Sequence, residues 1–258
     1  MQIQLLPSSF STNGESSPQQ HLTCLIINDR VAIDAGSLAM AASAEQRENI
    51  RDIVLTHAHL DHIAGLPLFV DDLFTKLKEP IRIHARPDTI EILERDIFNW
   101  SVYPRFSELK NSNGPVMEYR PYNPGVPFCV SGLRIKAMDV NHRVPSSGFV
   151  VSDDSSRIGF TGDTAEMGDF WDGLDRDGKV PVVLIECAFP DEMNDIAKIA
   201  SHLTPSRLAK ELEKGGLGER KFFITNIKPM FRETVIEQIK RLSLPNVEIL
   251  EIGKTYCF

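Results

Sequence analysis

Three of the seven histidines of this 258-residue chain stand within six residues of one another, in the stretch THAHLDHIAG (residues 56–65). Imidazole and carboxylate groups are ligands that suit zinc and similar divalent ions. The stretch offers His57, His59, Asp61 and His62. An i, i+2 spacing turns the rings of His57 and His59 to one side of an extended segment. The other two follow where a helix is expected to begin, so one short loop is predicted to serve two adjacent metal ions.

A strand must lead into this loop, and the sequence supplies one among many. Apolar, β-branched runs that end in a polar residue predict strands at 21–28, 30–36, 51–59, 81–85, 133–140, 148–152, 156–163, 180–189, 221–226 and 247–253. Apolar residues at i, i+3, i+4 spacing predict helices at 37–48, 65–77, 88–100, 204–215 and 232–242. Thr204 is expected to cap one helix, with Pro205 in its first turn. The mixture predicts a layered α/β fold with sites where strands run out into loops.

Composition bounds the partners and the compartment. A chain of 258 residues suits one large domain, and we predict a single domain over residues 1–258. The net charge of -8 disfavours a polymeric nucleic acid, whereas a small anionic substrate is compatible with it because a metal ion supplies positive charge locally. The scattered cysteines form no CxxC pair, and neither a signal-peptide pattern nor a membrane-spanning run is found. A cytoplasmic protein that binds no membrane is expected.

The HxHxDH motif behind an apolar strand resembles that of the metallo-β-lactamase fold. Further landmarks of that fold follow in its order, namely AIDAG, VNHRVPSSG, FTGDT, SHLTP and FFITNIKP. The resemblance implies a four-layer αββα sandwich, with two mixed β-sheets and helices on the outer faces. It also implies two divalent metal ions, with zinc favoured and manganese or iron as alternatives. The implied ligands are His57, His59, Asp61, His62, His142, bridging Asp163 and Asn226, with Asp34 supporting the site by hydrogen bonds.

Two longer stretches resemble class II cyclic-nucleotide phosphodiesterases. HAHLDHIAGLPLFVDDLF is similar to their HxHLDHxxG motif, and RPDTIEILERDIFNWSVYPRFSEL is similar to their segment in which an FN pair precedes an aromatic-Pro-x-Phe. IECAFP, SHLTPSRLAKEL and ITNIKP also resemble that family. The resemblance implies hydrolysis of cAMP, cGMP or both to the 5′-monophosphate by a metal-bridging hydroxide. A cyclic nucleotide is then the small-molecule partner, and a homodimer is expected.

Other hydrolases of the fold are the alternatives. Ribonuclease Z shares the histidine ladder and an equivalent of Glu186 with His202, but commonly carries a tRNA-gripping arm between its fourth histidine and its bridging aspartate. His142 and Asp163 are only 21 positions apart, a length taken up by two strands and a turn, so no arm is expected. The FNW…YPRF segment gives no support to a lactonase or a thioesterase. A weakened metal- or nucleotide-binding homologue is the third hypothesis, because of Asn226.

The resemblance also assigns roles to residues. His202 is the candidate acid that protonates the departing 3′ oxygen, and Glu186 is expected to hold its other ring nitrogen and raise its pKa. Asp61 is expected to bind metal, to orient the nucleophile, or both. Ser146 and Ser147 are candidate donors to the phosphate, with a plain turn role as the alternative. The nucleobase is expected to stack on one of several aromatic residues, at least two of which belong to the core. These are Phe98, Trp100, Tyr103 and Phe106.

Asn226 stands where relatives place a histidine ligand for the second metal. An amide oxygen is a weaker ligand for zinc than imidazole, although it suits harder cations. Three outcomes are open. Asn226 binds through its oxygen and favours manganese or magnesium, or it stands off and leaves the second metal loosely held or absent, or His202 replaces it as a ligand. We expect a weakened second site that metal can still occupy.

Overall fold

The computed structural model of the protein describes residues 1–258. The chain divides into two compact units, which are described separately. Unit 1 comprises Met1–Ser17, His21–Asn123 and Ile252–Phe258, and unit 2 comprises Pro18–Gln20 and Pro124–Glu251. None of the helices combines the length and the apolar character needed to cross a membrane. The cytoplasmic location stays a prediction, as does the assignment of residues 1–258 to one domain.

Unit 1 is built on a seven-stranded mixed sheet. In spatial order its strands are β16 (Thr255–Cys257), β1 (Gln2–Leu5), β2 (Leu25–Ile27), β3 (Val31–Ile33), β4 (Asp52–Val54), β5 (Ile81–Ala85) and β8 (Met117–Pro121). Strands β3, β4, β5 and β8 are paired in parallel, whereas β16, β1, β2 and β3 are paired antiparallel. A separate small hairpin pairs β6 (Lys110–Asn111) with β7 (Gly114–Pro115).

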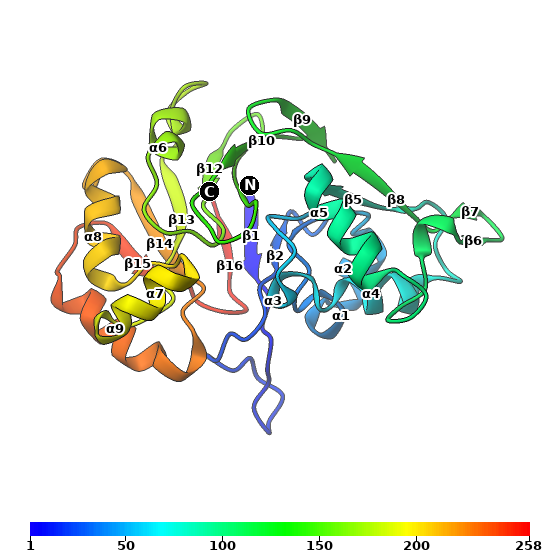
Figure 1. Cartoon of the computed structure of the whole chain (residues 1–258), viewed down its shortest axis with the longest axis horizontal. Helices are drawn as coiled ribbons and strands as arrows, with labels where there is room; N and C mark the ends of the chain where they lie inside the picture. Colours follow the sequence, from blue (N-terminus) through cyan, green and yellow to red (C-terminus); the bar gives the residue numbers. More distant parts are fainter. The chain divides into compact units, whose positions relative to one another are not determined.

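The helices of unit 1 pack on this sheet (Figure 1). They are α1 (Leu38–Ala41), α2 (Ala44–Asn49), α3 (Leu60–Ile63), α4 (Leu66–Leu73) and α5 (Pro87–Ile92), which continues as a π-helix over Leu93–Ile97. Leu38 of α1 and Phe69 of α4 share a buried cluster with Ile53 of β4. Burying side chains of this size contributes about 1.5–3 kcal/mol each. A capping box between Ser43 and Gln46 starts α2, which separates it from α1.

Unit 2 contains a second seven-stranded mixed sheet. In spatial order its strands are β15 (Val247–Ile249), β14 (Lys221–Thr225), β13 (Val182–Glu186), β12 (Arg157–Phe160), β11 (Ser147–Ser152), β10 (Leu133–Asp139) and β9 (Pro127–Val130). Strands β12 to β15 are paired in parallel, and β9 to β12 are joined by antiparallel pairings. Because β10 and β12 both run antiparallel to β11, the carboxyl ends of β10, β12, β13 and β14 lie at one edge of the sheet.

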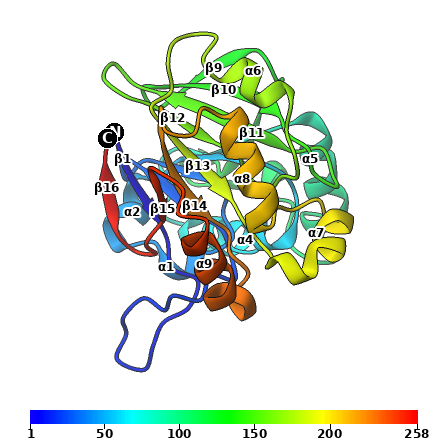
Figure 2. The same cartoon turned by 90° about the vertical axis from the view of Figure 1, so that its left-hand side faces the viewer.

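Unit 2 contains four α-helices. They are α6 (Asp169–Leu174), which contacts β10, and α7 (Asn194–Ala200), α8 (Pro205–Lys214) and α9 (Arg232–Arg241). Figure 2 shows α8 lying over β13 and β14. Leu208 and Leu212 of α8 pack with Val235 of α9 and Phe222 of β14 in one buried cluster. This packing fixes α8, and the loop that precedes it, against the strands.

The predicted elements are present, and some of the missed ones share a cause. Each predicted strand and helix overlaps an observed one, and most of the observed elements are shorter. Strands β1, β6, β7, β8, β9 and β16 and helices α6 and α7 were not predicted. Of these, β8, β9 and β16 lie at sheet edges, where exposed polar residues interrupt the apolar pattern. The predicted capping by Thr204 is wrong in its detail, because its side chain makes no capping hydrogen bond. The Asp191 carboxylate accepts from the Ser206 amide in the first turn instead, at 2.9 Å.

Candidate functional site

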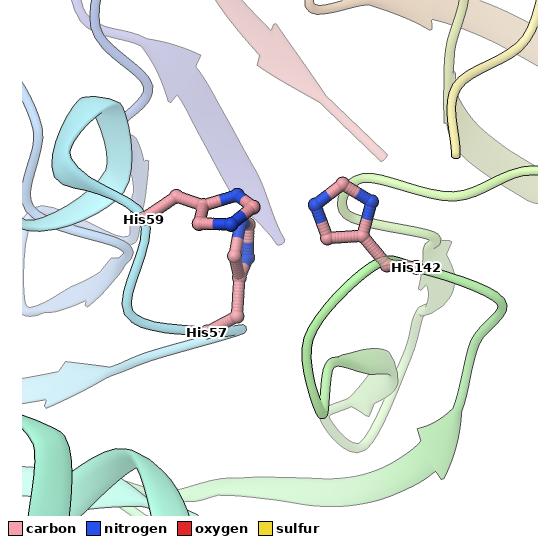
Figure 3. Close-up of side chains that lie close together, drawn as sticks. All are labelled: His57, His59 and His142. Atoms are coloured by element: carbon pink, nitrogen blue, oxygen red, sulfur yellow. The ribbon is translucent and has the colours of Figure 1, made fainter. Parts of the chain in front are cut away.

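The loop behind β4 carries the first group of candidate ligands, which we call the N-terminal ligand cluster. Its members are His57, His59, Asp61 and His62. The ring centroids of His57 lie 4.6 Å from His59 and 4.2 Å from His62. Figure 3 shows the His57 and His59 side chains pointing toward one another. Helix α3 begins at Leu60, directly after His59, so the structure brings the rings of the three histidines together as their spacing predicts.

Asp34 and Thr56 determine which ring nitrogen of His57 and of His62 donates a hydrogen bond. This buried carboxylate accepts from the Thr56 amide and hydroxyl, both at 2.8 Å, and lies 2.7 Å from Nδ1 of His62. Because a carboxylate only accepts, His62 donates through Nδ1. Nδ1 of His57 lies 2.9 Å from the Thr56 hydroxyl, which already donates to Asp34, so His57 donates through Nδ1 as well. In the neutral imidazole, both rings therefore present an unprotonated Nε2, the form that binds metal ions.

Close backbone approach explains why the AIDAG turn holds this loop. A Cβ at Gly36 would lie 2.0 Å from the Asp61 carbonyl oxygen, so glycine is required there. That same carbonyl accepts from the Thr23 amide at 2.8 Å. Asp34 itself adopts a positive φ of 60°, a conformation that aspartate tolerates better than most residues. The expected supporting role of Asp34 agrees with these contacts.

Changing Asp34 to asparagine is expected to weaken zinc binding by about 10- to 100-fold, the usual cost of losing a hydrogen-bond partner of a ligand histidine. The amide removes the charge and no longer fixes the tautomer of His62. Chelator competition with purified protein measures the effect. Asp52→Asn is the matched control, because Asp52 is also buried and lies 2.8 Å from a histidine, Nε2 of His84, outside the ligand cluster. Equal zinc affinity in the Asp34 variant and the wild type would contradict the assignment.

The edge formed by the strands of unit 2 carries a second group, the C-terminal ligand cluster. It comprises His142, Asp163 and His202. His142 follows β10 and Asp163 follows β12, while His202 precedes α8. One ligand atom of each lies within 4.8 Å of the others, and the two histidine ring centroids are 5.1 Å apart. Three segments that are distant in sequence thus present two imidazoles and a carboxylate at one place.

The His142 ring is oriented by backbone. Its Nδ1 lies 3.0 Å from the carbonyl oxygen of Ser201 and must donate to it. Nε2 is therefore the unprotonated nitrogen. Burial lowers the pKa of His142, against the opposing effect of the nearby Asp163 charge. A neutral imidazole with an unprotonated Nε2 is the state required of a metal ligand.

His202 is held by a completely buried carboxylate. Glu186, the last residue of β13, accepts from the Thr164 amide at 2.8 Å and the Ala188 amide at 3.1 Å, and lies 2.7 Å from Nδ1 of His202. Burial alone lowers the pKa of His202, but the negative charges of Glu186 and Asp163 outweigh it, so the pKa is raised above its usual value. Nε2 of His202 lies 4.0 Å from Oδ2 of Asp163. The structure thus brings the predicted pair of His202 and Glu186 into contact.

Asn226 lies beside the predicted bridging carboxylate. It follows β14 directly, adopts a positive φ of 51°, and donates a hydrogen bond from its amide nitrogen to Oδ1 of Asp163. Its position agrees with the place assigned from the motif order. Its role as a metal ligand stays a prediction.

The two candidate phosphate donors have different environments in the structure. The Ser146 hydroxyl donates to the Val144 carbonyl at 2.9 Å, which is the turn role. Ser147 begins β11, and its buried hydroxyl has no hydrogen-bond partner in the structure. Ser147 is therefore the better candidate of the two, and its contact with substrate stays a prediction.

The four aromatic candidates for base stacking differ in their burial. Phe98 and Phe106 are buried, with ring centroids 5.9 Å apart, so two core residues are found as expected. The Tyr103 hydroxyl donates to Asp71 at 3.1 Å. Trp100 alone is well exposed, at 57%. Among the four, Trp100 is the ring available for a stacking contact.

Several supporting residues were not identified from sequence. The Phe189 ring packs edge-on against His202, with centroids 5.6 Å apart. Its place in the IECAFP motif, three positions after Glu186, is the signal from which it could have been identified. Thr56 and Ser201 act through a hydroxyl and a carbonyl next to ligand candidates, and no pattern of residue types reveals such contacts.

A family profile described as a beta-lactamase superfamily domain matches residues 29–224. The chain belongs to this superfamily. The crystal structure of unliganded yeast PDE1 covers 98% of this chain and 98% of its own, with a TM-score of 0.77 at 16% sequence identity. The predicted fold class, an α/β fold with two mixed sheets and helices, is therefore confirmed, and so is the resemblance to metallo-β-lactamase-fold proteins.

Curated relatives carry names from the predicted enzyme class. A probable 3′,5′-cyclic-nucleotide phosphodiesterase of Yersinia pestis is 27% identical over 78% of this chain and 63% of its own length. A 3′,5′-cyclic-nucleotide phosphodiesterase of Aliivibrio fischeri is 27% identical over 82% of this chain and 69% of its own. A nuclear ribonuclease Z of Triticum aestivum is 29% identical over 51% of this chain and 69% of its own. All three names belong to phosphodiester hydrolases.

The donor set of both clusters fits divalent metal ions. Imidazole Nε2 atoms with their Nδ1 atoms fixed by acceptors, together with a carboxylate, are the ligands found around zinc and similar ions. The acceptors that fix these Nδ1 atoms are Asp34, the Thr56 hydroxyl and the Ser201 carbonyl. Divalent metal binding, as the superfamily implies, is consistent with the residues that each unit presents.

Proposed function

We propose that this chain is a metal-dependent phosphodiesterase that hydrolyses the 3′ ester of cAMP, cGMP or both to leave the 5′-monophosphate. The observation that carries the proposal is the extent of the match. The relatives named cyclic-nucleotide phosphodiesterases match most of the chain, whereas the ribonuclease Z relative matches about half. The chain spans about two thirds of the length of the phosphodiesterase relatives, so their activity is transferred here as a proposal.

The N-terminal ligand cluster, with His142, Asp163 and Asn226, is proposed to supply the ligands of two divalent ions, with zinc favoured and manganese or iron as alternatives. His57, His59 and His142 are assigned to one ion, and Asp61, His62 and Asn226 to the other, with Asp163 shared between them. When bound, such ions supply positive charge for the phosphate oxygens and lower the pKa of water toward neutrality. The fixed Nδ1 contacts of His57, His62 and His142 support this assignment.

His202 is proposed to protonate the departing 3′ oxygen. Glu186 accepts the hydrogen bond from Nδ1–H, so the proton that moves to substrate leaves from Nε2. The raised pKa of His202 favours the protonated form near neutral pH. Asp61 is proposed to orient the nucleophile in addition to binding metal. Ser147 is proposed to donate to a phosphate oxygen.

Ribonuclease Z activity is the weaker candidate. Between His142 and Asp163 the chain forms β11 and β12, joined by the turn at 153–156, which leaves no segment for a tRNA-gripping arm. The net charge of -8 also opposes binding of a polyanion. A small-molecule cyclic nucleotide is therefore the proposed partner, and the homodimer stays a prediction.

A substrate panel tests the proposed function. Purified protein loaded with zinc or manganese is offered cAMP, cGMP, a linear phosphodiester, a lactone and a precursor tRNA. Turnover of a cyclic nucleotide with little or no cleavage of precursor tRNA is expected. Preference for precursor tRNA or for the lactone would replace the proposal with the corresponding hydrolase.

Changing Asn226 to histidine is expected to tighten binding of the second zinc ion. Imidazole is the stronger zinc ligand, and the substitution also removes the amide that donates to Asp163. Zinc stoichiometry and competition titration of both proteins measure the change. Thr225→Val, one residue earlier and outside the ligand set, is the control for general effects of substitution. Unchanged affinity of the weaker site would count against a second-site role for position 226.

A further inference from the structure

The loops that carry the C-terminal ligand cluster are tied together by contacts beyond the ligands themselves. The carbonyl of Asn141, next to His142, accepts from the Ala165 amide at 2.6 Å. The Asn141 side chain donates to the carbonyl of Glu166 at 2.9 Å. These contacts join the His142 loop to the Asp163 loop. The contact of His142 Nδ1 with the Ser201 carbonyl joins the His142 loop to the His202 loop.

An ion pair joins the Asp163 loop to the His202 loop. Arg207, in the first turn of α8, donates through Nε to Oε1 of Glu166 at 2.6 Å and through Nη2 to Oε2. Its remaining amine, Nη1, donates to the carbonyl oxygen of His202 at 2.7 Å. The Arg207 guanidinium thus binds the Asp163 loop through the Glu166 carboxylate and the His202 loop through the His202 carbonyl. The Arg207 side chain is only 9% exposed, whereas its partner Glu166 is 44% exposed, so the guanidinium is buried and the ion pair is partly open to water.

We propose that Glu166 and Arg207 are positioning residues that set His202 relative to Asp163 and His142. The inference rests on the proposed function in taking the C-terminal ligand cluster as part of a metal centre. Neither residue touches a ligand side chain directly. They act through the His202 carbonyl and through the backbone of the Asp163 loop, and so hold Asp163 and His142, the proposed ligands, and His202, the proposed acid, at their mutual spacing.

The geometry requires arginine and not merely a positive charge. A guanidinium presents a rigid fork that pairs with both carboxylate oxygens while a third amine points elsewhere, whereas an ammonium acts as a point charge. Arg207→Lys keeps the charge next to Glu166 and loses the link to the His202 carbonyl. Glu166→Gln is the milder variant, because the amide oxygen of glutamine can still accept from the guanidinium although the negative charge is lost.

Arg220 provides a closely matched control in the same unit. Its side chain is 6% exposed, it pairs with both oxygens of Asp175, and its Nη1 donates to the Val180 carbonyl at 2.7 Å. Asp175 is exposed to nearly the same degree as Glu166, at 45% against 44%. Arg220 contacts none of the three ligand loops in these bonds. Arg220→Lys therefore reproduces the loss of a buried forked ion pair without touching the ligand cluster.

The test is zinc affinity, measured by chelator competition on the metal-stripped full-length chain titrated with zinc alone. Arg207→Lys is expected to weaken zinc binding by about 10-fold, because losing the link to the His202 carbonyl loosens the neighbouring Ser201 carbonyl that orients His142. Glu166→Gln is expected to weaken it by less, and Arg220→Lys to leave it at the wild-type value. Thermal unfolding of the stripped proteins is expected to show both arginine variants destabilised. With the proposed substrate, Arg207→Lys should lower kcat more than it changes KM.

Wild-type zinc affinity in Arg207→Lys, or an equal loss in Arg220→Lys, would overturn the proposal. If Arg207→Lys does not fold, Glu166→Gln decides, and unchanged zinc affinity in that variant overturns it equally. Zinc binding requires no nucleotide, so the positioning role of Arg207 and Glu166 can be rejected independently of the proposed phosphodiesterase function. A wild-type chain that hydrolyses no cyclic nucleotide but loses zinc affinity in Arg207→Lys keeps the positioning role and rejects the proposed function.

Discussion

Replacing His59 by alanine is expected to abolish cyclic-nucleotide turnover and to lower the metal content of the purified protein. The substitution removes an imidazole from the loop behind β4, where the rings of His57 and His59 are 4.6 Å apart. Metal ions contribute several kcal/mol to stabilising the charge of a transition state. A loss of that size corresponds to a fall in kcat/KM of about 10³-fold or more. Turnover assays and metal analysis of the same preparation measure both effects.

The control for this experiment is His21→Ala. His21 is exposed and belongs to neither ligand cluster, so its removal is expected to keep metal content and turnover at the wild-type level. Melting curves of the metal-stripped proteins show whether the His59 variant is folded. Full activity in a folded His59→Ala protein would refute the assignment of the N-terminal ligand cluster.

Replacing His202 by alanine is expected to lower kcat by about 10²- to 10⁴-fold, the usual contribution of a general acid. Glu186→Gln tests the same pair through pH. An acid must be protonated to act, so activity falls as the pH rises through the pKa of His202. The Glu186 charge raises that pKa, so its removal is expected to move the alkaline limb of the kcat profile to lower pH. Steady-state rates over a range of pH measure the shift.

Metal analysis separates the possible roles of His202. An acid that binds no metal can be lost with little change in metal content, whereas a ligand in place of Asn226 cannot. Retained metal with a low kcat in His202→Ala supports the acid role. An unchanged kcat would rule it out, and a loss of one metal ion per chain would assign His202 to the second ion.

Two buried carboxylates use the same contact for different purposes. Asp34 lies on Nδ1 of His62, and Glu186 lies on Nδ1 of His202, both at 2.7 Å. Each also accepts hydrogen bonds from backbone amides. Asp34 thereby fixes the orientation of the His62 ring, whereas the charge of Glu186 raises the pKa of His202.

The sequence predicted what depends on local pattern. Spacing alone brought together the rings of His57, His59 and His62, and apolar runs located the strands whose ends carry Asp163 and Asn226. The family resemblance added His202 and Glu186. Contacts through backbone were invisible, because the Ser201 carbonyl would serve equally well from any residue type.

Contacts between residues that are distant in the sequence were also not predictable. Arg207 meets Glu166 across 41 positions, and nothing in either neighbourhood marks the pair. The helix predicted over 88–100 changes to a π-helix at Leu93 and ends at Ile97, which sends Phe98 into the core and leaves Trp100 exposed. Helical spacing cannot reveal that change, because tertiary packing decides it.

The most direct test of the central claim is the identity of the reaction product. Metal-loaded protein is incubated separately with 3′,5′-cAMP and 3′,5′-cGMP, and the products are separated by chromatography and identified by phosphorus NMR. The proposed chemistry predicts the 5′-monophosphate as the product from at least one of the two, with the reaction lost in His59→Ala. No hydrolysis of either nucleotide with zinc, manganese or iron, or formation of the 3′-monophosphate, would contradict it.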